Sequence, residues 1–386
     1  MIKKYTRYYT WAEWVTDGNF ENTNAHCKVA TGIKIFPAFN CSKTKNLALY
    51  RIMEDKNPQT SFFEVSGGQN SAVKIEQMVL HGKKPGPVVW LTAGIHGDEF
   101  GCVRVVREVI KRLKNGKLRC GTVYAFPLLN YSGSINNSRL IPKSQEDLNR
   151  LFPGNKDGSL GERIAHAVFS KITESNPVVV LDIHDDIDAN WIKSVSYVLV
   201  DPKSGFRSSG AYKATNKLAE KTGLMVVREE KTKNNEWKKT LSGSLILNNI
   251  PSMTIELGNT NTSNKVNVNL GITSVWNALA SLGIVEPKQL NLKSFIKNKF
   301  SGKPLVYSDR PRIKMNGVIK FLIKPGDVVK RGQIIAEISN KSRKTRGTAV
   351  KAMNNGILLG HANQNVAHPG FKTFSFAVVK NSSTIL

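Results

Sequence analysis

Two segments of the sequence combine histidine and carboxylate side chains at a spacing that suits a metal ion. In the first, 94–101 (GIHGDEFG), His96 and Glu99 lie three residues apart after an apolar run. In the second, 182–186 (DIHDD), His184 ends another apolar run. Two imidazoles and one carboxylate form the donor set of many hydrolytic zinc sites, which keep one position open for water. Together these three side chains are the expected ligands of one Zn²⁺ per chain, whereas taken singly His96 and Glu99 also suit a loop or helix start with a capping acid, and His184 also suits a structural role.

A third segment, residues 137–154, carries charged and amide side chains without hydrophobic periodicity. Its sequence is NSRLIPKSQEDLNRLFPG, so we expect Arg139, Asn149 and Arg150 to lie in a loop. A guanidinium in a loop can bind a carboxylate through two hydrogen bonds or face a developing oxyanion. Structural ion pairs would account for the same residue types, and the sequence alone leaves both interpretations open.

A fourth segment, residues 253–258, places one acid in an apolar run. In its sequence, MTIELG, the only ionisable side chain is Glu256. A carboxylate among apolar neighbours costs free energy unless it has a partner. A general base that takes a proton from water at the metal site explains this residue, so we expect Glu256 to be catalytic.

Apolar runs and helical periodicity place these segments in an alternating pattern of strands and helices. We expect strands at 87–93, 122–126, 178–183, 197–201, 224–228 and 252–257. We expect helices at 103–113, 160–174, 211–222 and 269–282. This alternation predicts an α/β fold, a mixed sheet with helices on both faces. Carboxyl ends of neighbouring strands would then bring His96 and His184 together.

Changes in composition along the chain predict four segments. Residues 1–60 show weak periodicity and stay unassigned, whereas residues 61–285 form the α/β domain with the candidate site. Residues 286–303 are rich in Lys, Asn and Pro, which suits a linker. Residues 304–386 consist of short β-type runs between turn residues and predict a small all-β domain.

Charge is the unusual feature of the composition. The 386 residues include 56 basic and 29 acidic side chains, a net charge of +27. From Pro287 to Leu386, 19 basic and 3 acidic residues give +16. Such a field attracts polyanions, so a polyanion-binding protein that uses its basic C-terminal domain is one hypothesis. A lysine-rich solvated surface is the simpler explanation, because net charge by itself bears on solubility and loose association. The complete metal set argues against binding as the sole function, and nucleic acid is not the partner we expect.

The remaining composition favours a folded cytoplasmic protein. Hydrophobic residues make up 40% of the chain, which excludes a wholly disordered protein. The first residues lack the apolar run of a secretory signal, and no stretch reaches the ~18 apolar residues of a membrane span. The four cysteines form no CxxC pair, which suits free thiols in a reducing compartment.

Taken in order, the four motifs resemble the succinylglutamate desuccinylase/aspartoacylase family of the zinc carboxypeptidase-like superfamily. The resemblance covers about residues 70 to 285 and implies a zinc carboxypeptidase-like fold for this deacylase domain. It implies that His96, Glu99 and His184 bind zinc and that Glu256 acts as base and then as acid. It also implies that Arg139 lies near the scissile carbonyl oxygen, and the residues it implies for the substrate carboxylate are Asn149 and Arg150.

Two regions qualify this resemblance. After the last histidine the family usually carries a small hydroxyl or amide residue, whereas this chain has Asp185, Asp186 and Asp188, which could receive a cationic substrate group. In the C-terminal domain, 324–338 and 354–359 resemble the two halves of a biotinyl/lipoyl-type domain. Three lysines lie near the expected hairpin, but none has the usual context of a modified lysine: Lys341, Lys344 and Lys351. We therefore expect this domain to act as a lid, a scaffold or an oligomer contact.

The sequence therefore predicts a zinc-dependent hydrolase that cleaves the amide bond of a small N-acyl amino acid or related N-acylated amine. The expected substrate carries a carboxylate. A metallocarboxypeptidase or peptide amidase with the same zinc site is the nearest alternative, because it would use the same metal and base. The sequence names neither the acyl group nor the amine, and it leaves a homo-oligomer open.

Overall fold

The computed structural model describes most of the chain after residue 57. The described residues are 58–68, 71–114, 116–186, 191–193, 195–201, 210–229, 235–258, 265–287, 304–339, 347–363 and 365–379. Almost all of the unassigned segment 1–60, most of the linker predicted at 286–303, and Asp188, Lys341 and Lys344 lie outside them. Cys102 and Cys120, the two described cysteines, are free thiols.

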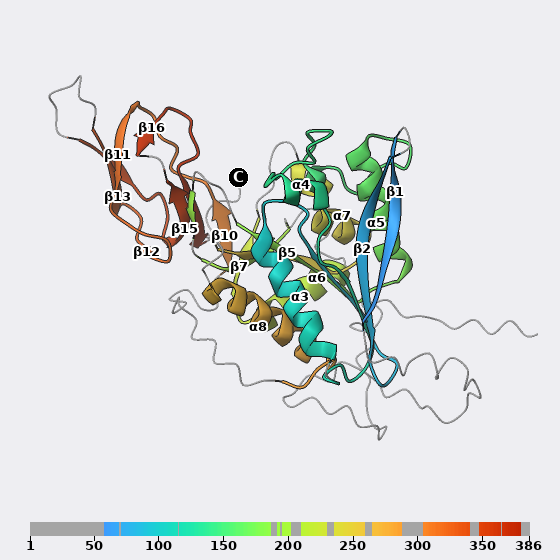
Figure 1. Cartoon of the computed structure of the whole chain (residues 1–386). Helices are drawn as coiled ribbons and strands as arrows, with labels where there is room; N and C mark the ends of the chain where they lie inside the picture. Colours follow the sequence, from blue (N-terminus) through green and yellow to red (C-terminus); the bar gives the residue numbers. More distant parts are fainter. Residues whose placement is uncertain are drawn as a thin grey trace, which may run out of the picture.

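Within the described residues, thirteen strands form one mixed sheet that extends from β1 to the strands after residue 304 (Figure 1). Its strand order is β1-β2-β4-β3-β5-β9-β7-β8-β10-β17-β15-β12, and β6 pairs with β15. The strands β4, β3, β5 and β9 are parallel neighbours, whereas β7 runs antiparallel to β9. Their bounds are β1 Gln59–Gly68, β2 Ser71–His81, β3 Val88–Ala93, β4 Thr122–Phe126, β5 Val179–Asp185, β6 Trp191–Lys193, β7 Tyr197–Val200, β8 Met225–Arg228 and β9 Ser252–Leu257. The strands after residue 304 are β10 Leu305–Ser308, β12 Val328–Val329, β15 Gly356–Ala362 and β17 Phe374–Val379.

Helices cover both faces of the parallel part of the sheet, which confirms the predicted α/β class. On one face α3 (Phe100–Lys114), α6 (Gly210–Ala219) and α8 (Lys265–Ser281) contribute to a core with apolar residues of β3, β5 and β9. On the other face α5 (Leu160–Glu174) and α7 (Leu241–Leu247) pack on Trp90 and Val180. The short helix α4 (Tyr131–Ile135) follows β4.

Local signals account for the elements that the sequence predicted. The predicted helix 160–174 matches α5, because Ser159 and Glu162 form a capping box at its start. β4 and β9 have their predicted bounds. α8 begins at Lys265, four residues before the predicted start. None of the helices in the described residues is both long and apolar enough to cross a lipid bilayer.

Among the described residues from 304 on, the regular secondary structure consists of strands, which turns connect. A second sheet contains the strands β11 (Gly317–Phe321), β13 (Ile334–Ser339), β14 (Thr348–Lys351) and β16 (Val366–Ala367). Their order in the sheet is β14-β13-β11-β16. β10 pairs in parallel with β8, so these strands continue the sheet that carries the candidate site. Val227 and Leu305 also share one buried cluster. The four segment boundaries stay predictions.

Candidate active site

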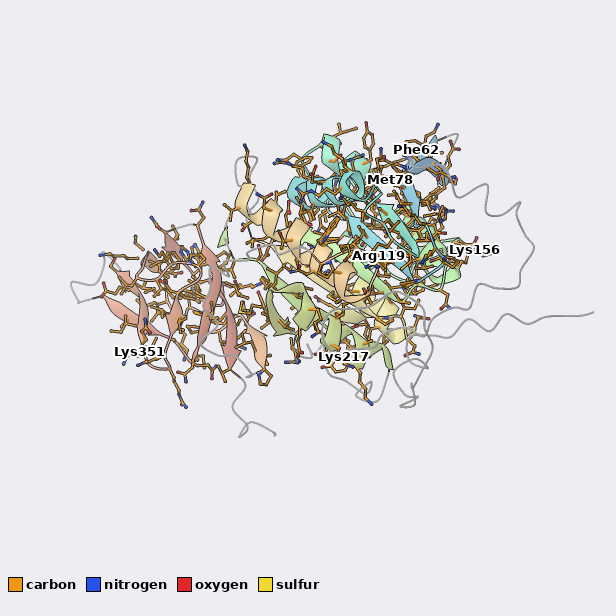
Figure 2. All side chains as sticks on the ribbon, turned by 90° about the horizontal axis from the view of Figure 1, so that it is seen from below. Phe62, Met78, Arg119, Lys156, Lys217 and Lys351 are labelled. Carbon is orange, nitrogen blue, oxygen red and sulfur yellow. The ribbon has the colours of Figure 1, made fainter. Side chains whose placement is uncertain are left out.

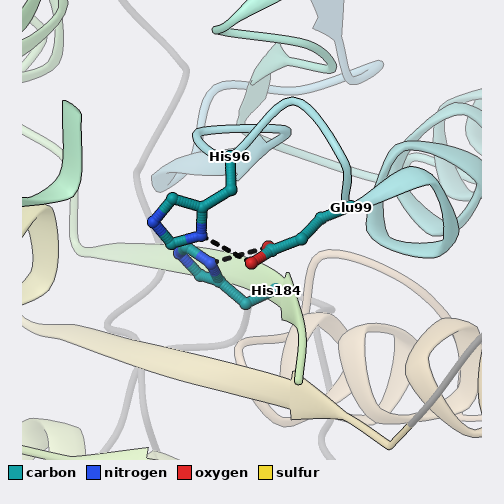
Figure 3. A group of neighbouring side chains, drawn as sticks. All are labelled: His96, Glu99 and His184. Atoms are coloured by element: carbon teal, nitrogen blue, oxygen red, sulfur yellow. Dashed lines mark hydrogen bonds and ion pairs between the residues drawn. The ribbon is translucent and has the colours of Figure 1, made fainter. Parts of the chain in front are cut away.

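His96, Glu99 and His184 meet at the carboxyl ends of two neighbouring strands (Figure 3). His96 and Glu99 lie in the loop between β3 and α3, and His184 lies near the end of β5. His96 Nδ1 lies 2.5 Å from Glu99 Oε1, and His184 Nδ1 lies 2.9 Å from Glu99 Oε2. Each residue is 3% exposed, and one donor atom from each lies within 4.8 Å of the others. The structure thus brings together the three predicted metal ligands.

The loop that carries His96 and Glu99 is held by close backbone packing. Gly94 turns the chain after β3 with a φ of +62°, a conformation that favours glycine. Gly97 packs so tightly on the backbone of Gly133 in α4 that a Cβ at this position would overlap it. Asp185 Oδ2 accepts the Gly101 N–H at 2.5 Å and so joins the end of β5 to the first turn of α3. These contacts position the two ends of the site against each other.

The outward ring nitrogens of both histidines also face carboxylates. His96 Nε2 lies 3.2 Å from Asp147 Oδ1, and His184 Nε2 lies 3.1 Å from Asp182 Oδ2. The Thr92 hydroxyl donates to Asp182 at 2.6 Å. Carboxylates in this position orient metal-binding imidazoles and raise their basicity. With both Nδ1 atoms directed at Glu99, the residues present fit a divalent metal ion of the Zn²⁺ type.

The charges of the neighbouring side chains oppose the effect of burial at this cluster. Burial alone would raise the pKa of Glu99, but the imidazoles of His96 and His184 hold it well below its usual range. Burial would lower the pKa of His184, but Asp182 and Glu99 raise it well above the ordinary value. The Glu99 carboxylate is thus held ionised beside the two imidazoles, and a negative charge in this position also favours a bound cation.

Arg139 reaches the cluster from the loop 137–154. Its Nη1 lies 3.2 Å from His96 Nδ1 and 3.8 Å from Glu99 Oε1. Its Nε and Nη2 donate to Asp147 Oδ2 at 3.2 and 3.0 Å. The Arg139 side chain is 41% exposed, so part of the guanidinium faces solvent beside the cluster. The structure thus shows an ion pair between Arg139 and Asp147, and the position of Arg139 beside a reacting carbonyl stays a prediction.

Asn149 and Arg150 lie in the short 3₁₀ helix Leu148–Arg150 of the same loop. The Asn149 side-chain oxygen accepts the Leu241 N–H at 2.9 Å, where α7 begins. Arg150 Nη1 donates to the Asn149 carbonyl at 2.8 Å. The charge of Arg150 also acts on two carboxyl groups, Asp147 and Glu229. Asn149 therefore has a structural contact that its sequence motif did not reveal.

Glu256 occupies the strand next to His184. The two residues are register partners in the parallel pair β5–β9, so their side chains leave the same face of the sheet. Tyr197 of β7 lies opposite Glu256 on the other side. Glu256 is partly buried. The predicted base thus lies one strand away from a predicted metal ligand.

Sequence reasoning missed Asp147 and gave a different role to the acids after His184. The signal for Asp147 was its place in the same DLNR run as Asn149 and Arg150. Asp185 is buried and accepts a hydrogen bond from the Gly101 N–H. Asp186 Oδ2 accepts a hydrogen bond from the Tyr197 hydroxyl at 3.2 Å. These two acids are therefore engaged within the protein.

Comparison with known proteins gives the family of the chain. A family profile described as "Succinylglutamate desuccinylase/Aspartoacylase catalytic domain" matches residues 85–280. The chain belongs to this family. It is 26% identical over 266 residues to N-alpha-acetyl-L-2,4-diaminobutyric acid deacetylase of Halomonas elongata, covering 67% of this chain and 72% of the relative.

Two solved structures share the fold. An aspartoacylase family protein from Mesorhizobium loti has a TM-score of 0.68 at 19% identity and covers 85% of this chain and 97% of its own. The ectoine utilization protein EutE (DoeB) from Ruegeria pomeroyi, in a product-bound structure, has a TM-score of 0.67 at 18% identity and covers 85% and 96%. Because the residues before 304 make up less than 85% of the chain, the shared fold extends beyond the matched catalytic segment.

Proposed function

We propose that this member of the family is a zinc-dependent deacylase that hydrolyses the amide bond of a small N-acyl amino acid. The observation that carries the proposal is the buried His96, Glu99 and His184 cluster, with both Nδ1 atoms directed at one carboxylate. Glu256 lies on the same sheet face one strand away. A metal site with a neighbouring carboxylate base is the arrangement that metal-assisted amide hydrolysis requires.

In the proposed mechanism, each side chain has a separate task. His96, Glu99 and His184 would hold Zn²⁺, which would supply a Lewis acid that lowers the pKa of water and polarises the amide carbonyl. Glu256 accepts the proton of the attacking water and returns it to the leaving nitrogen. Arg139 donates hydrogen bonds to the oxyanion that forms from the carbonyl oxygen.

Arg150 and the amide nitrogen of Asn149 would hold the carboxylate of the substrate amino acid. Arg150 belongs to the same loop as Arg139, so binding the carboxylate there would orient the amide toward the metal cluster. The relative from Halomonas elongata is named for an N-acetylated diamino acid. We therefore include N-acetylated diamino acids in the proposed substrate class.

The test is hydrolysis by the zinc-loaded full chain, measured as freed amine. The panel contains N-acetyl and N-succinyl amino acids, N-acetyl-2,4-diaminobutyrate and short peptides. We expect release from N-acyl amino acids, and a Glu256→Gln variant should keep its zinc but lose kcat by roughly 10² to 10⁴, the range for a general base. Glu286→Gln is the matched control, because this side chain is 71% exposed and pairs with Arg119.

Two outcomes would contradict the proposal. Hydrolysis confined to peptides would favour the carboxypeptidase or amidase alternative with the same zinc site. Near wild-type kcat in a zinc-replete Glu256→Gln variant would show that another group activates the water.

A further inference from the structure

A groove between α3 and α8 lies on the face of the sheet opposite Glu256 and His184. Its volume is about 420 Å³, within the range of small-molecule sites. The two helices pack against each other, and Gly271 of α8 allows the close approach, since a Cβ there would meet Val105 of α3 at 2.9 Å. Figure 1 shows the two helices side by side on this face. The groove is therefore a separate feature from the candidate active site.

Basic side chains surround this groove. Arg104, Arg107 and Lys111 recur at helical spacing along α3, and Arg112 and Lys265 also line it. Val268 and Ile272 of α8 are the apolar residues of the lining. The groove thus combines a cationic rim with an apolar part.

Two of these cations are already neutralised. Arg107 pairs with Glu76 at 2.6 Å, and Arg112 pairs with Glu108 at 2.8 Å. In the part of the chain that the structure describes, the other three cations have no ion-pair partner: Arg104, Lys111 and Lys265. Lys265 is also the first residue of α8, so the positive end of that helix adds to the field. An excess of three positive charges faces one groove.

We propose that the α3–α8 groove binds a small organic polyphosphate, such as a nucleoside triphosphate. Three or four negative charges would match the three unpaired cations, whose N–H groups form strong charge-assisted hydrogen bonds with phosphate oxygens. The apolar side chains of Val268 and Ile272 would contact the organic part of the ligand. A single phosphate group, with a charge of about −2, would leave part of this positive charge uncompensated.

The test is calorimetric titration of the full-length zinc-loaded protein with ATP, inorganic tripolyphosphate and a 15-mer of oligodeoxythymidine at about 0.15 M salt. We expect one site for ATP and for tripolyphosphate. Arg104→Gln, Lys111→Gln and Lys265→Gln should each weaken binding on the order of tenfold, the loss of one charge-assisted contact. Hydrolysis of N-acyl substrates should stay unchanged in all three variants. The polyphosphate site and the deacylase activity are therefore tested independently.

Lys351→Gln is the matched control for the three variants. Lys351 is exposed and lies at the far end of the C-terminal strands (Figure 2). It should bind ATP as the wild type does, and extraction of zinc by the phosphates would affect every variant equally. No binding by the wild type, equal weakening in the Lys351→Gln control, or binding of the oligonucleotide alone would overturn the proposal. The last result would indicate a nucleic-acid surface instead.

Discussion

Asp201 should make the stability of this protein fall as the pH rises. It follows β7, is 5% exposed, and accepts the Ser242 hydroxyl at 2.8 Å. Burial and the nearby Glu229 carboxylate raise its pKa to about 8. A carboxyl in an unfolded chain has a pKa of about 3.9, so between these values the folded protein keeps a proton that the unfolded chain has released.

The expected size follows from that difference. A raised folded-state pKa stabilises the fold fully below about pH 4, and this contribution disappears as the pH passes through about 8. Each pH unit inside this window costs about 1.4 kcal/mol, so titration of Asp201 removes about 2 kcal/mol between pH 6 and pH 8. Asp201→Asn keeps an oxygen acceptor for Ser242 and does not ionise, so it should lack this part of the pH dependence.

Urea unfolding of both proteins at pH 6, 7 and 8 measures the effect. From pH 6 to pH 8, the free energy of unfolding of the wild type should fall by about 2 kcal/mol relative to that of Asp201→Asn. Asp157→Asn is the control, because its side chain is 78% exposed and its variant should follow the wild type. Parallel pH profiles for wild type and Asp201→Asn would refute the assigned titration.

Three further predictions test the candidate site. His184→Ala should lose the bound zinc measured by elemental analysis, whereas Asp182→Asn should keep the site with about 10- to 100-fold weaker zinc affinity in chelator competition. An unchanged zinc content in His184→Ala would show that His184 is not a metal ligand. Arg150→Ala should raise KM much more for substrates with a free carboxylate than for their carboxamides, because only the former lose a bidentate contact; equal effects on both would give Arg150 a structural role. Gly97→Ala should lower the free energy of unfolding by about 1 to 3 kcal/mol, since its methyl group overlaps the Gly133 backbone, and an unchanged urea midpoint would contradict that packing.

The candidate metal ligands could be predicted from sequence because His96 and Glu99 follow one short apolar strand and His184 lies near the end of another. β3 and β5 are recognisable from their own residues, and parallel neighbours end at the same side of a sheet, so His96 and His184 had to approach each other. Asp147 could not be found in this way. Its role depends on how a loop without periodicity folds back onto His96 across 51 residues of sequence.

The hairpin β1–β2 was missed for a related reason. Continuous apolar runs and helical periodicity of apolar residues indicate buried elements. β1 is instead largely exposed on both sides, and its Phe62 is 62% exposed. Its regular partner is β2, and only that pairing defines it as a strand. The start of α8 was missed because Lys265 and Val266 are exposed, so the apolar pattern begins only one turn later.

The junction between β8 and β10 has a consequence for any shortened form of the chain. Leu305 and Val306 of β10 pair with Val227 and Arg228 of β8. A protein that ends before Leu305 would leave the N–H and C=O groups of β8 as an open sheet border beside a buried apolar side chain. Open borders of this kind recruit strands from other molecules and cause aggregation. The complete sheet instead ends in β12, which is only two residues long. The C-terminal strands therefore protect the solubility of the α/β region, whatever other task they have.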